Sequence, residues 1–199
     1  MAAADDDDAE EQEHLVTTWS GELVDHIPHG QGTATYSNGD SFEGAYDMGK
    51  KQGSGLYKFA NGATYKGEYI DNVRNGRGTL SYPDKSSYDG SWKSGKKDGI
   101  GAYTYANGDI YKGDWLDDKR HGKGTYYFKD SMSQFCGAWV LGNFANGEWI
   151  HRDGNIYEGG FALNKPQGPG VFKFFRSNNM LHGEYADKKW SSGQIVSLP

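Results

Sequence analysis

The stretch Tyr65-Lys66-Gly67-Glu68-Tyr69, followed by Gly76-Arg77-Gly78-Thr79-Leu80-Ser81-Tyr82, decides the fold of this chain. It contains an aromatic anchor, Gly at +2, an aromatic at +4, Gly at +11 and +13, and an aromatic at +17. The same pattern recurs along the chain. Its anchors lie 23 residues apart at Trp19, Phe42, Tyr65, Tyr88 and Tyr111, and continue with slips of one residue at Phe135, Tyr157 and a degenerate Leu181. A fixed period of this length predicts a repeat architecture, in which each unit buries its apolar face against its neighbours.

The composition agrees with a folded repeat. The chain has 30 glycines, 15% aromatic residues and only 5 prolines among 199 residues. Disordered chains have few aromatics, and collagen needs Gly at every third position. The single cysteine, Cys136, has no partner within the chain, which fits a reducing compartment. No apolar stretch approaches the length of a membrane span, and the N-terminus is acidic, so we expect a soluble, intracellular protein.

Charge divides the chain into segments. Residues 1–13 carry seven acidic side chains and no basic one, which leaves 21 basic against 20 acidic residues in the remainder. We therefore expect an acidic disordered tail over 1–13, a nearly neutral repeat array over 14–185, and a C-terminal segment over 186–199. The last segment includes the apolar stretch from Trp190 to Leu198, which we expect to cap one end of the array.

Side chains within each repeat alternate with the period of a β-strand. Tyr65, Gly67 and Tyr69 share one face of a first strand, and Gly78, Leu80 and Tyr82 share one face of a second. The opposite face is polar. Each repeat is thus predicted to be an amphipathic hairpin, and eight repeats, the last incomplete, predict about fifteen strands. The expected fold is all-β, an elongated single-layer antiparallel sheet of consecutive hairpins that curves into a trough.

The connections between these strands are of two predicted kinds. Tight hairpin turns are indicated by Asn-Gly or Asp-Gly, dipeptides that tolerate positive φ, at 38–39, 61–62, 107–108 and 153–154. Pro83-Asp84-Lys85 has Lys where the other turns have Gly, so we expect a different turn there. The second kind is expected to be longer and charged, as in the segment 49–53.

Glycine within a strand costs roughly 0.5–1 kcal/mol relative to Ala. Its repeated use on the aromatic face therefore needs a reason. We expect each missing side chain to leave a slot in which an aromatic ring of the next strand lies flat. Aromatic pairs then add about 0.5–1.5 kcal/mol each beyond burial. On this basis Gly67→Val and Gly113→Val should each destabilise the fold by several kcal/mol.

The pattern Tyr-x-Gly-x-Trp/Tyr followed by Gly-x-Gly-x-x-Tyr/Phe resembles the MORN repeat over roughly residues 19–185. A narrower resemblance is to the radial spoke head MORN proteins of cilia and flagella. It is carried by 38–44, 57–69, the stretch Pro166-Gln167-Gly168-Pro169-Gly170, and His182-Gly183-Glu184-Tyr185. The resemblance implies a structural subunit of the axonemal radial spoke head, located in the cytoplasm, cytoskeleton and axoneme. Members of that family often continue into a polar or acidic C-terminal extension, whereas this sequence ends at Pro199.

Two candidate surfaces follow from the pattern. The first is an aromatic trough, which presents rings to a partner strand or helix. The alternative is that these rings form only the core of the hairpins, which have no other. The proposed trough residues are Tyr65, Tyr69, Tyr88, Trp92, Tyr105, Tyr111, Trp115, Phe128 and Trp139.

The second surface is a basic edge formed by residues at +8 and +9 from each anchor. We expect these side chains to emerge from loops at one edge of the sheet and to attract anionic lipid headgroups or an acidic protein segment. The alternatives are ordinary loop solubility and contact with the acidic tail of the chain itself. The basic edge comprises Lys50, Lys51, Arg74, Lys96, Lys97, Lys119 and Arg120.

No residue pattern indicates catalysis. His29, His121 and His182 recur with the repeat but lack metal-ligand spacing, so no metal is expected. The Gly-x-Gly segments do not continue as a nucleotide-binding loop, so no cofactor is expected. Cys136 is interpreted as a passive strand residue.

The leading hypothesis is therefore a non-catalytic scaffold of the radial spoke head. Its expected partners are other spoke-head proteins and, through unpaired edge strands, a second copy of the chain. Nucleic acid is not expected. A membrane-tethering module that binds anionic phospholipids is the alternative, although the near-neutral array and acidic tail argue against it. The targeting half of an enzyme would require a catalytic domain in a longer chain.

Overall fold

The computed structural model describes residues 15–186 and 189–198, so the predicted acidic tail lies outside the described residues. All regular elements in these residues are β-strands. Their bounds are β1 Val16–Val24, β2 Ile27–Tyr36, β3 Ser41–Asp47, β4 Lys50–Lys58, β5 Thr64–Ile70, β6 Val73–Ser81, β7 Ser87–Lys93, β8 Lys96–Thr104, β9 Ile110–Leu116, β10 Lys119–Phe128, β11 Ser133–Val140, β12 Asn143–Ile150, β13 Ile156–Ala162, β14 Lys165–Phe174, β15 Asn179–Ala186 and β16 Lys189–Ser197.

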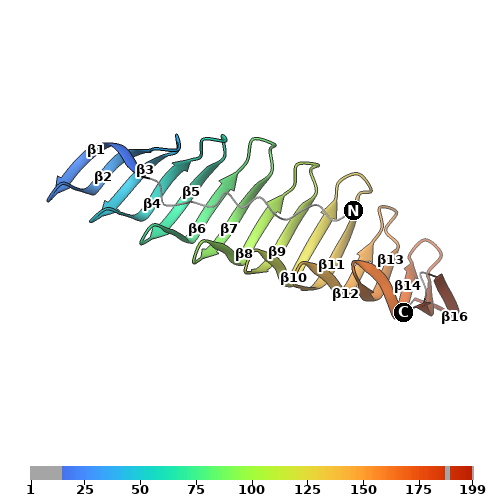
Figure 1. Cartoon of the computed structure of the whole chain (residues 1–199). Helices are drawn as coiled ribbons and strands as arrows, with labels where there is room; N and C mark the ends of the chain where they lie inside the picture. Colours follow the sequence, from blue (N-terminus) through green and yellow to red (C-terminus); the bar gives the residue numbers. More distant parts are fainter. Residues whose placement is uncertain (1–14, 187–188, 199) are drawn as a thin grey trace. The chain divides into compact units, whose positions relative to one another are not determined.

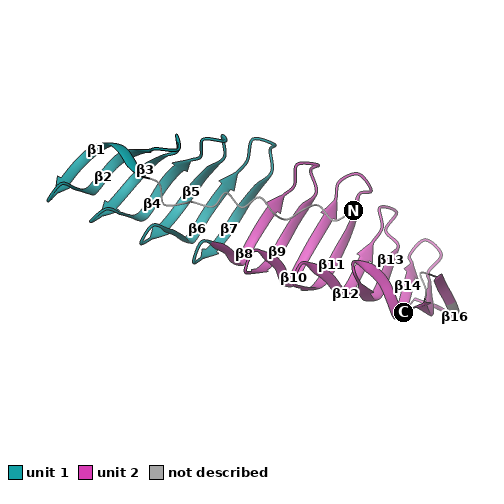
Figure 2. Cartoon of the chain, viewed as in Figure 1, with its two compact units in different colours: residues 1–95 teal, residues 96–199 magenta. Residues whose placement is uncertain are grey.

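The strands follow one another in the sheet in the order in which they occur in the chain (Figure 1). The predicted single open antiparallel sheet of consecutive hairpins is thereby confirmed. The chain divides into two compact units, with β1 to β7 in residues up to Gly95 and β8 to β16 from Lys96 onward (Figure 2). The described residues form sixteen strands in place of the expected fifteen, because the C-terminal segment forms β16 and pairs with β15 from Ala186↔Lys189 to Asn179↔Ser197.

The Asn-Gly turns have the conformation that the sequence predicts. In the turn between β2 and β3, the N–H of Gly39 donates to the carbonyl of Tyr36 at 3.0 Å, and the N–H of Tyr36 donates to the carbonyl of Asp40 at 2.9 Å. Gly39 has a φ of 91°. This is a three-residue loop in which a type I turn is followed by a left-handed residue.

The turn at Lys85 is of this same type, so the expectation of a different turn was wrong. The N–H of Lys85 donates to the carbonyl of Tyr82, and that of Tyr82 donates to the carbonyl of Ser86, both at 3.0 Å. Lys85 takes the left-handed conformation with a φ of 74°. Asp84 accepts hydrogen bonds from the Ser86 hydroxyl at 2.6 Å and the Ser86 N–H at 2.8 Å, which also lower the pKa of the Asp84 carboxyl. The second bond is equivalent to the one that Asn38 accepts from the N–H of Asp40 at 3.0 Å. Local side-chain bonds thus fix a turn that lacks its glycine.

Lys85→Gly should stabilise the protein by roughly 0.5–1 kcal/mol, because a left-handed L-residue costs about 1–2 kcal/mol and the added backbone freedom of Gly offsets part of the gain. Urea denaturation measures the change. The matched control is Lys93→Gly, at an exposed position at the end of β7, which should destabilise the protein by roughly 0.5–1 kcal/mol. Equal destabilisation in both variants would contradict this account of the turn.

The second kind of connection is shorter than predicted. Between β3 and β4 only Met48 and Gly49 lie outside the strands, with φ values of 44° and 81°. Two successive left-handed residues are typical of a type I′ hairpin turn. The charged segment that was expected to form a long loop is therefore the first part of β4.

A bulge follows each of several type I′ turns. Along β3 and β4 the pairing changes from Gly44↔Gly55 to Ala45↔Gln52, which leaves Gly53 and Ser54 without a partner in β3. Gly53 has a φ of 66°, and Gly76 and Gly122, at the same repeat position, have φ values of 69° and 59°. The glycine at +11 therefore serves a left-handed bulge position.

The glycines at +2 and +13 provide space for the rings. A Cβ atom at Gly67 would lie 2.4 Å from the Oη atom of Tyr65, and one at Gly78 would lie 2.3 Å from the same atom. The predicted glycine slot is present, but the ring that fills it belongs to the anchor of the same hairpin and not to a following strand. The Tyr65 hydroxyl also donates to the carbonyl of Glu68 at 3.2 Å, and its ring contacts Trp92 edge to face at a centroid distance of 5.3 Å.

Candidate functional site

The residues of the proposed aromatic trough form the core. Tyr65, Tyr88 and Tyr111 are completely buried, and the remainder are at most 9% exposed except Phe128, which is half-buried. The buried members are Tyr65, Tyr69, Tyr88, Trp92, Tyr105, Tyr111, Trp115 and Trp139. The expectation that these rings are open to a partner was wrong, and the alternative of core packing holds for them. The reason is that each ring lies against glycine backbone on one side and against neighbouring rings at its edges.

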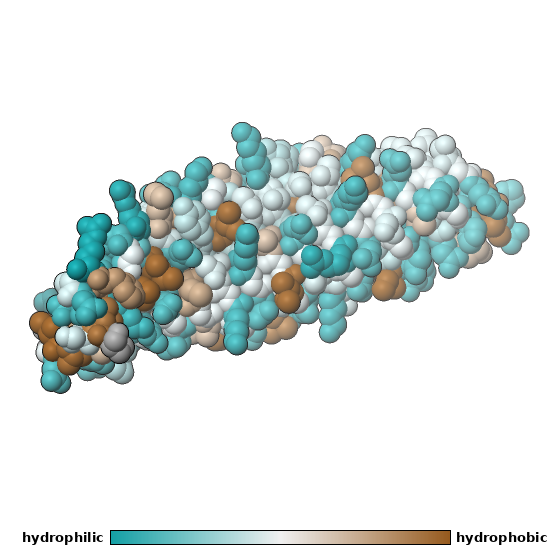
Figure 3. All heavy atoms as spheres, turned by 180° about the vertical axis from the view of Figure 1, so that it is seen from behind, coloured by the Kyte–Doolittle hydropathy of each residue, from teal (hydrophilic) through white to brown (hydrophobic). Residues whose placement is uncertain are grey.

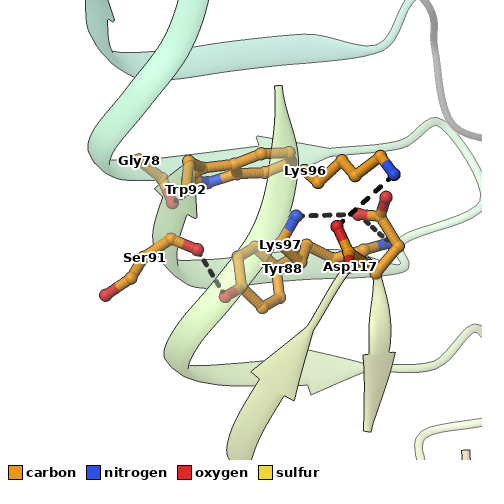
Figure 4. A network of polar contacts seen from close by, with 8 residues as sticks. Gly78, Tyr88, Ser91, Trp92, Lys96, Lys97 and Asp117 are labelled. Carbon is orange, nitrogen blue, oxygen red and sulfur yellow. Dashed lines mark hydrogen bonds and ion pairs between the residues drawn. The ribbon is translucent and has the colours of Figure 1, made fainter. Parts of the chain in front are cut away.

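The polar ends of the rings are satisfied by backbone carbonyls. Within the first unit, the indole N–H of Trp92 donates to the carbonyl of Gly78 at 3.0 Å, and the Tyr88 hydroxyl donates to the carbonyl of Ser91 at 2.9 Å (Figure 4). Buried aromatic side chains with polar ends normally require such partners. These contacts therefore stabilise the hairpins and leave the rings unavailable for recognition.

The basic edge separates into two sets of side chains. Lys51, Arg74 and Lys97, all at +9, are 4–6% exposed, so the prediction that they emerge from loops was wrong. The Nζ atom of Lys51 lies 4.6 Å from the ring centroid of Tyr57, and the Cζ atom of Arg74 lies 4.5 Å from that of Trp92. Because the turn has only two residues, position +9 faces the rings, where a cation is stabilised by the π-electrons.

Arg120 and Lys119 follow the same division. Arg120 is half-buried, and its guanidinium donates to the Tyr105 hydroxyl at 3.1 Å and to the carbonyl of Gly142 at 2.9 Å. Lys119, at +8, is exposed. The equivalent of Arg120 in the next repeat is Phe144, which is fully buried. An aromatic residue at this position shows that +9 belongs to the core and not to a binding surface.

Of the exposed bases at +8, Lys50 and Lys96 are paired with acids of the following turn. Lys50 lies 3.3 Å from Asp71, and Lys96 lies 3.4 Å from Asp117 (Figure 4). The sequence analysis did not pair them because the partners are 21 residues apart, close to one full repeat. These carboxylates reduce the positive field that was expected to attract anionic lipid.

Two buried carboxylates connect consecutive hairpins, and the sequence analysis missed both. Asp109 accepts a hydrogen bond from the Tyr126 hydroxyl at 2.9 Å and one from the N–H of Lys129 at 2.8 Å. Asp40 accepts equivalent bonds from Tyr57 at 2.6 Å and Ala60 at 2.7 Å. The signal in the sequence is an Asp directly after Asn-Gly, two residues before the next anchor.

Burial raises the pKa of the Tyr126 hydroxyl above its ordinary value, and the hydrogen bond to Asp109 adds to the effect. Burial likewise raises the pKa of Tyr111. Because the unfolded chain ionises these groups first, their contribution to stability is complete below about pH 10 and is lost as the pH rises toward the folded pKa. We expect the urea midpoint to fall above about pH 10, and to fall less in Tyr126→Phe. A midpoint that stays constant to about pH 11 would contradict this.

The polar face of the first unit contains a groove with a volume of about 740 Å³. Its floor is the backbone of paired glycines from β3 to β6, because Gly44↔Gly55, Gly55↔Gly67 and Gly67↔Gly78 are directly opposite one another. The residues on either side of each glycine point out of this face and form the two walls. One wall consists of Glu43, Leu56, Lys66, Thr79 and Asp89, and the other of Gln31, Ser54, Glu68 and Arg77.

The groove is the accessible concavity that the sequence analysis did not identify. Glu43, Ser54, Lys66, Glu68 and Arg77 are all exposed. A surface that carries side chains of both charges suits an extended peptide, whose own polar groups need partners. The face drawn in Figure 3 shows mainly polar and neutral residues with isolated apolar ones. Apolar residues gather on this face only near the end that carries the C-terminus.

The described residues contain no group of three or more His, Cys, Asp or Glu side chains placed to hold a metal ion. Cys136 is exposed, and its Sγ atom lies 3.5 Å from the Thr125 hydroxyl. A search of residues 15–186 and 189–198 for helices of sufficient length and hydrophobicity to cross a bilayer finds none.

Comparisons with known proteins give a short match and two distant structural similarities. The chain is 50% identical over 40 residues to the inactive protein tyrosine kinase pTKL of Plasmodium berghei (strain Anka), a match that covers 20% of this chain and 3% of that protein. A mutant of the TCP10 domain of Danio rerio CPAP has a TM-score of 0.42 at 12% identity, covering 94% of this chain and 99% of that domain. The Drosophila melanogaster SAS-4 TCP domain, in complex with a proline-rich motif of Ana2, has a TM-score of 0.31 at 12% identity, covering 85% and 84%.

The repeats themselves match a known family. The MORN repeat model matches residues 19–41, 42–64, 65–87, 88–110, 111–133 and 157–175, which together make up more than half of the chain. Each match begins at one of the predicted anchors. The predicted repeats that begin at Phe135 and Leu181 have no match. In the repeat from Phe135 the pairing shifts between Ala138 and Trp139, and Phe144 stands at +9. MORN repeats are non-enzymatic modules of protein interaction or membrane association. The chain belongs to the MORN-repeat family.

Proposed function

We propose that this protein is a non-catalytic scaffold of the axonemal radial spoke head, which supports ciliary or flagellar motility by binding other spoke-head subunits. The observation that carries the proposal is the groove on the polar face of the first unit, since it offers charged side chains and glycine backbone while the aromatic residues are enclosed. The residue stretches 38–44, 57–69 and 166–170, which resemble radial spoke head proteins, support this assignment over other MORN proteins.

The proposed location follows from this role: cytoplasm, cytoskeleton and the axoneme of cilia or flagella. A second copy of the chain is a further proposed partner, because β1 and β16 are the terminal strands of the described sheet. Each pairs along one edge in the described sheet, and an exposed edge can add a strand from another chain. The membrane-tethering alternative loses support because Lys50 and Lys96 are paired with Asp71 and Asp117.

The test is capture of the tagged full-length chain from detergent-extracted axonemes, with the bound proteins identified by mass spectrometry. We expect spoke-head subunits to be retained by the unmodified chain and lost in the double variant Glu43→Arg, Lys66→Glu, because both side chains line the groove. The matched control is Lys93→Glu, at an exposed position of β7 that is not among the groove residues. Absence of spoke-head subunits from the unmodified capture would refute the assignment.

Liposome flotation provides the competing measurement. Strong, salt-sensitive binding to vesicles that contain anionic phospholipid, with loss of that binding in Lys50→Glu, Lys96→Glu, would favour the membrane-tethering function. The scaffold proposal predicts that flotation is weak and unaffected by these substitutions, because Asp71 and Asp117 lie beside the two lysines and weaken their attraction for anionic lipid.

A further inference from the structure

At two of the bulges that follow the type I′ turns, a backbone N–H donates to a carboxylate side chain on the polar face. We infer that the N–H of Ser54, in the groove of the first unit, is a binding site for a carboxylate side chain of an extended partner peptide. This inference rests on the proposed function of the groove and specifies the chemistry of its ligand. It is drawn from a comparison of equivalent positions within the chain.

In two hairpins the protein fills this position with a carboxylate of its own. Glu68 Oε1 accepts a hydrogen bond from the N–H of Arg77 at 3.2 Å, and Asp114 Oδ2 accepts one from the N–H of Lys123 at 2.8 Å. Both acids are at +3 from their anchors, and both amides are at +12. The carboxylates lie directly over the bulge glycines, since a Cβ atom at Gly76 or Gly122 would be 2.3 Å or 2.5 Å from them.

The β3–β4 hairpin has the same bulge but no such acid. Its residue at +3 is Ala45, which has no oxygen in its side chain, and its amide at +12 is that of Ser54. Gly53 has a φ of 66°, close to the 69° of Gly76, so the N–H of Ser54 takes the orientation seen at Arg77. A Cβ atom at Gly53 would meet no atom within 4 Å, which shows that the position occupied elsewhere by the carboxylate is open space.

A backbone N–H in a left-handed bulge is a strong donor, and such concave groups of amides bind anionic oxygens. Ser54 also lines the groove, together with the exposed cations Lys66 and Arg77. An Asp or Glu of a bound peptide therefore replaces the acid that Ala45 lacks. The groove also contains three carboxylates, Glu43, Glu68 and Asp89, so the amide donor, and not a net positive charge, selects the acidic side chain.

The second unit contains a natural negative control. Gly168 is the bulge glycine of the β13–β14 hairpin, and a Cβ atom at this position would also meet no atom within 4 Å. The residue at +12 there is Pro169, which has no N–H to donate. An open bulge alone therefore does not make a carboxylate site, and the donor at Ser54 is the deciding feature.

The experiment is an NMR titration of the 15N-labelled full-length chain with two peptides of alternating residues, Gly-Glu and Gly-Gln, each of three repeats. We expect the Ser54 amide proton to move downfield and saturate with the Gly-Glu peptide only. The Arg77 amide should stay unchanged, because Glu68 already occupies it. In Ala45→Glu the chain fills its own site, and the response of Ser54 should weaken by about tenfold.

Glu68→Ala provides a gain-of-function variant, in which the Arg77 amide should begin to respond to the Gly-Glu peptide. The remaining amides report that each variant is folded. An unmoved Ser54 amide, an equal response to the Gly-Gln peptide, or an undiminished response in Ala45→Glu would each overturn the inference. The titration needs no spoke-head protein, so failed axonemal capture with an intact Ser54 response would refute only the proposed function, and the converse would refute only this inference.

Discussion

Gly67→Val is expected to lower the free energy of unfolding by roughly 3 kcal/mol. A Cβ atom at Gly67 would lie 2.4 Å from the Oη atom of Tyr65 and 2.6 Å from the Cα atom of Gly78. The second contact is with backbone that pairs directly with Gly67, so no rotation of a side chain relieves it. The Tyr65 ring would have to leave its position, where it is completely buried.

The measurement is urea denaturation of the full-length variant. The matched control is Lys66→Val, one residue earlier on the exposed face of the same strand, where a β-branched residue is favoured and the change should stay within about 0.5 kcal/mol. Gly113→Val tests the same contact in the second unit, since its Cβ atom would lie 2.4 Å from the carbonyl oxygen of Lys123. Unchanged midpoints in both glycine variants would show that the rings do not depend on these slots.

Asp109→Ala should destabilise the protein by about 2–3 kcal/mol, because it removes the acceptor of three hydrogen bonds, one of them from the buried Tyr126 hydroxyl. The Tyr126 hydroxyl and the N–H of Lys129 both donate to this carboxylate, which is 9% exposed. Asp40→Ala should have a similar effect through Tyr57 and Ala60. In each case the turn that precedes one hairpin loses its attachment to the next.

A double-mutant cycle tests whether the Tyr126 hydroxyl is the hydrogen-bond partner through which Asp109 stabilises the fold. Tyr126→Phe removes one of the donors to Asp109, so Asp109→Ala should cost less in that background than alone. Asp130→Ala, at an exposed turn position, serves as the control and should change the stability by less than about 0.5 kcal/mol. Additive effects of the Asp109 and Tyr126 substitutions would contradict the role assigned to their hydrogen bond.

Strand positions were predictable because alternation and the 23-residue period are local properties of the sequence. Tyr65, Gly67 and Leu80 lie on the face that their spacing indicates. The turn at Lys85 was not predictable from glycine rules, because the bond from the Ser86 N–H to Asp84, which the Asn-Gly turns also make, supports this conformation without a glycine. A rule that considers one residue at a time does not include such a bond.

The candidate surfaces were harder to predict, since accessibility is a property of the packed structure. Consecutive bases such as Lys50 and Lys51 were interpreted as a loop because charge normally indicates solvent. Alternation within a strand instead places Lys50 outward, beside Asp71, and Lys51 inward, over aromatic rings. The groove depends on which side chains are absent from the polar face as much as on those present, and its walls come from six strands, β2 to β7.

Glycines at equivalent repeat positions pair between adjacent hairpins, so one hairpin can take the place of another in the sheet. Gly55↔Gly67 and Gly78↔Gly90 are the same contact, one repeat apart. Excision of residues 65–87 would therefore join Thr64 to Tyr88 without a change of register, and Gly55 would meet Gly90 across the new junction. Duplication or deletion of one such repeat in the gene would therefore preserve the strand register. The length of the sheet can change in evolution by two strands at a time.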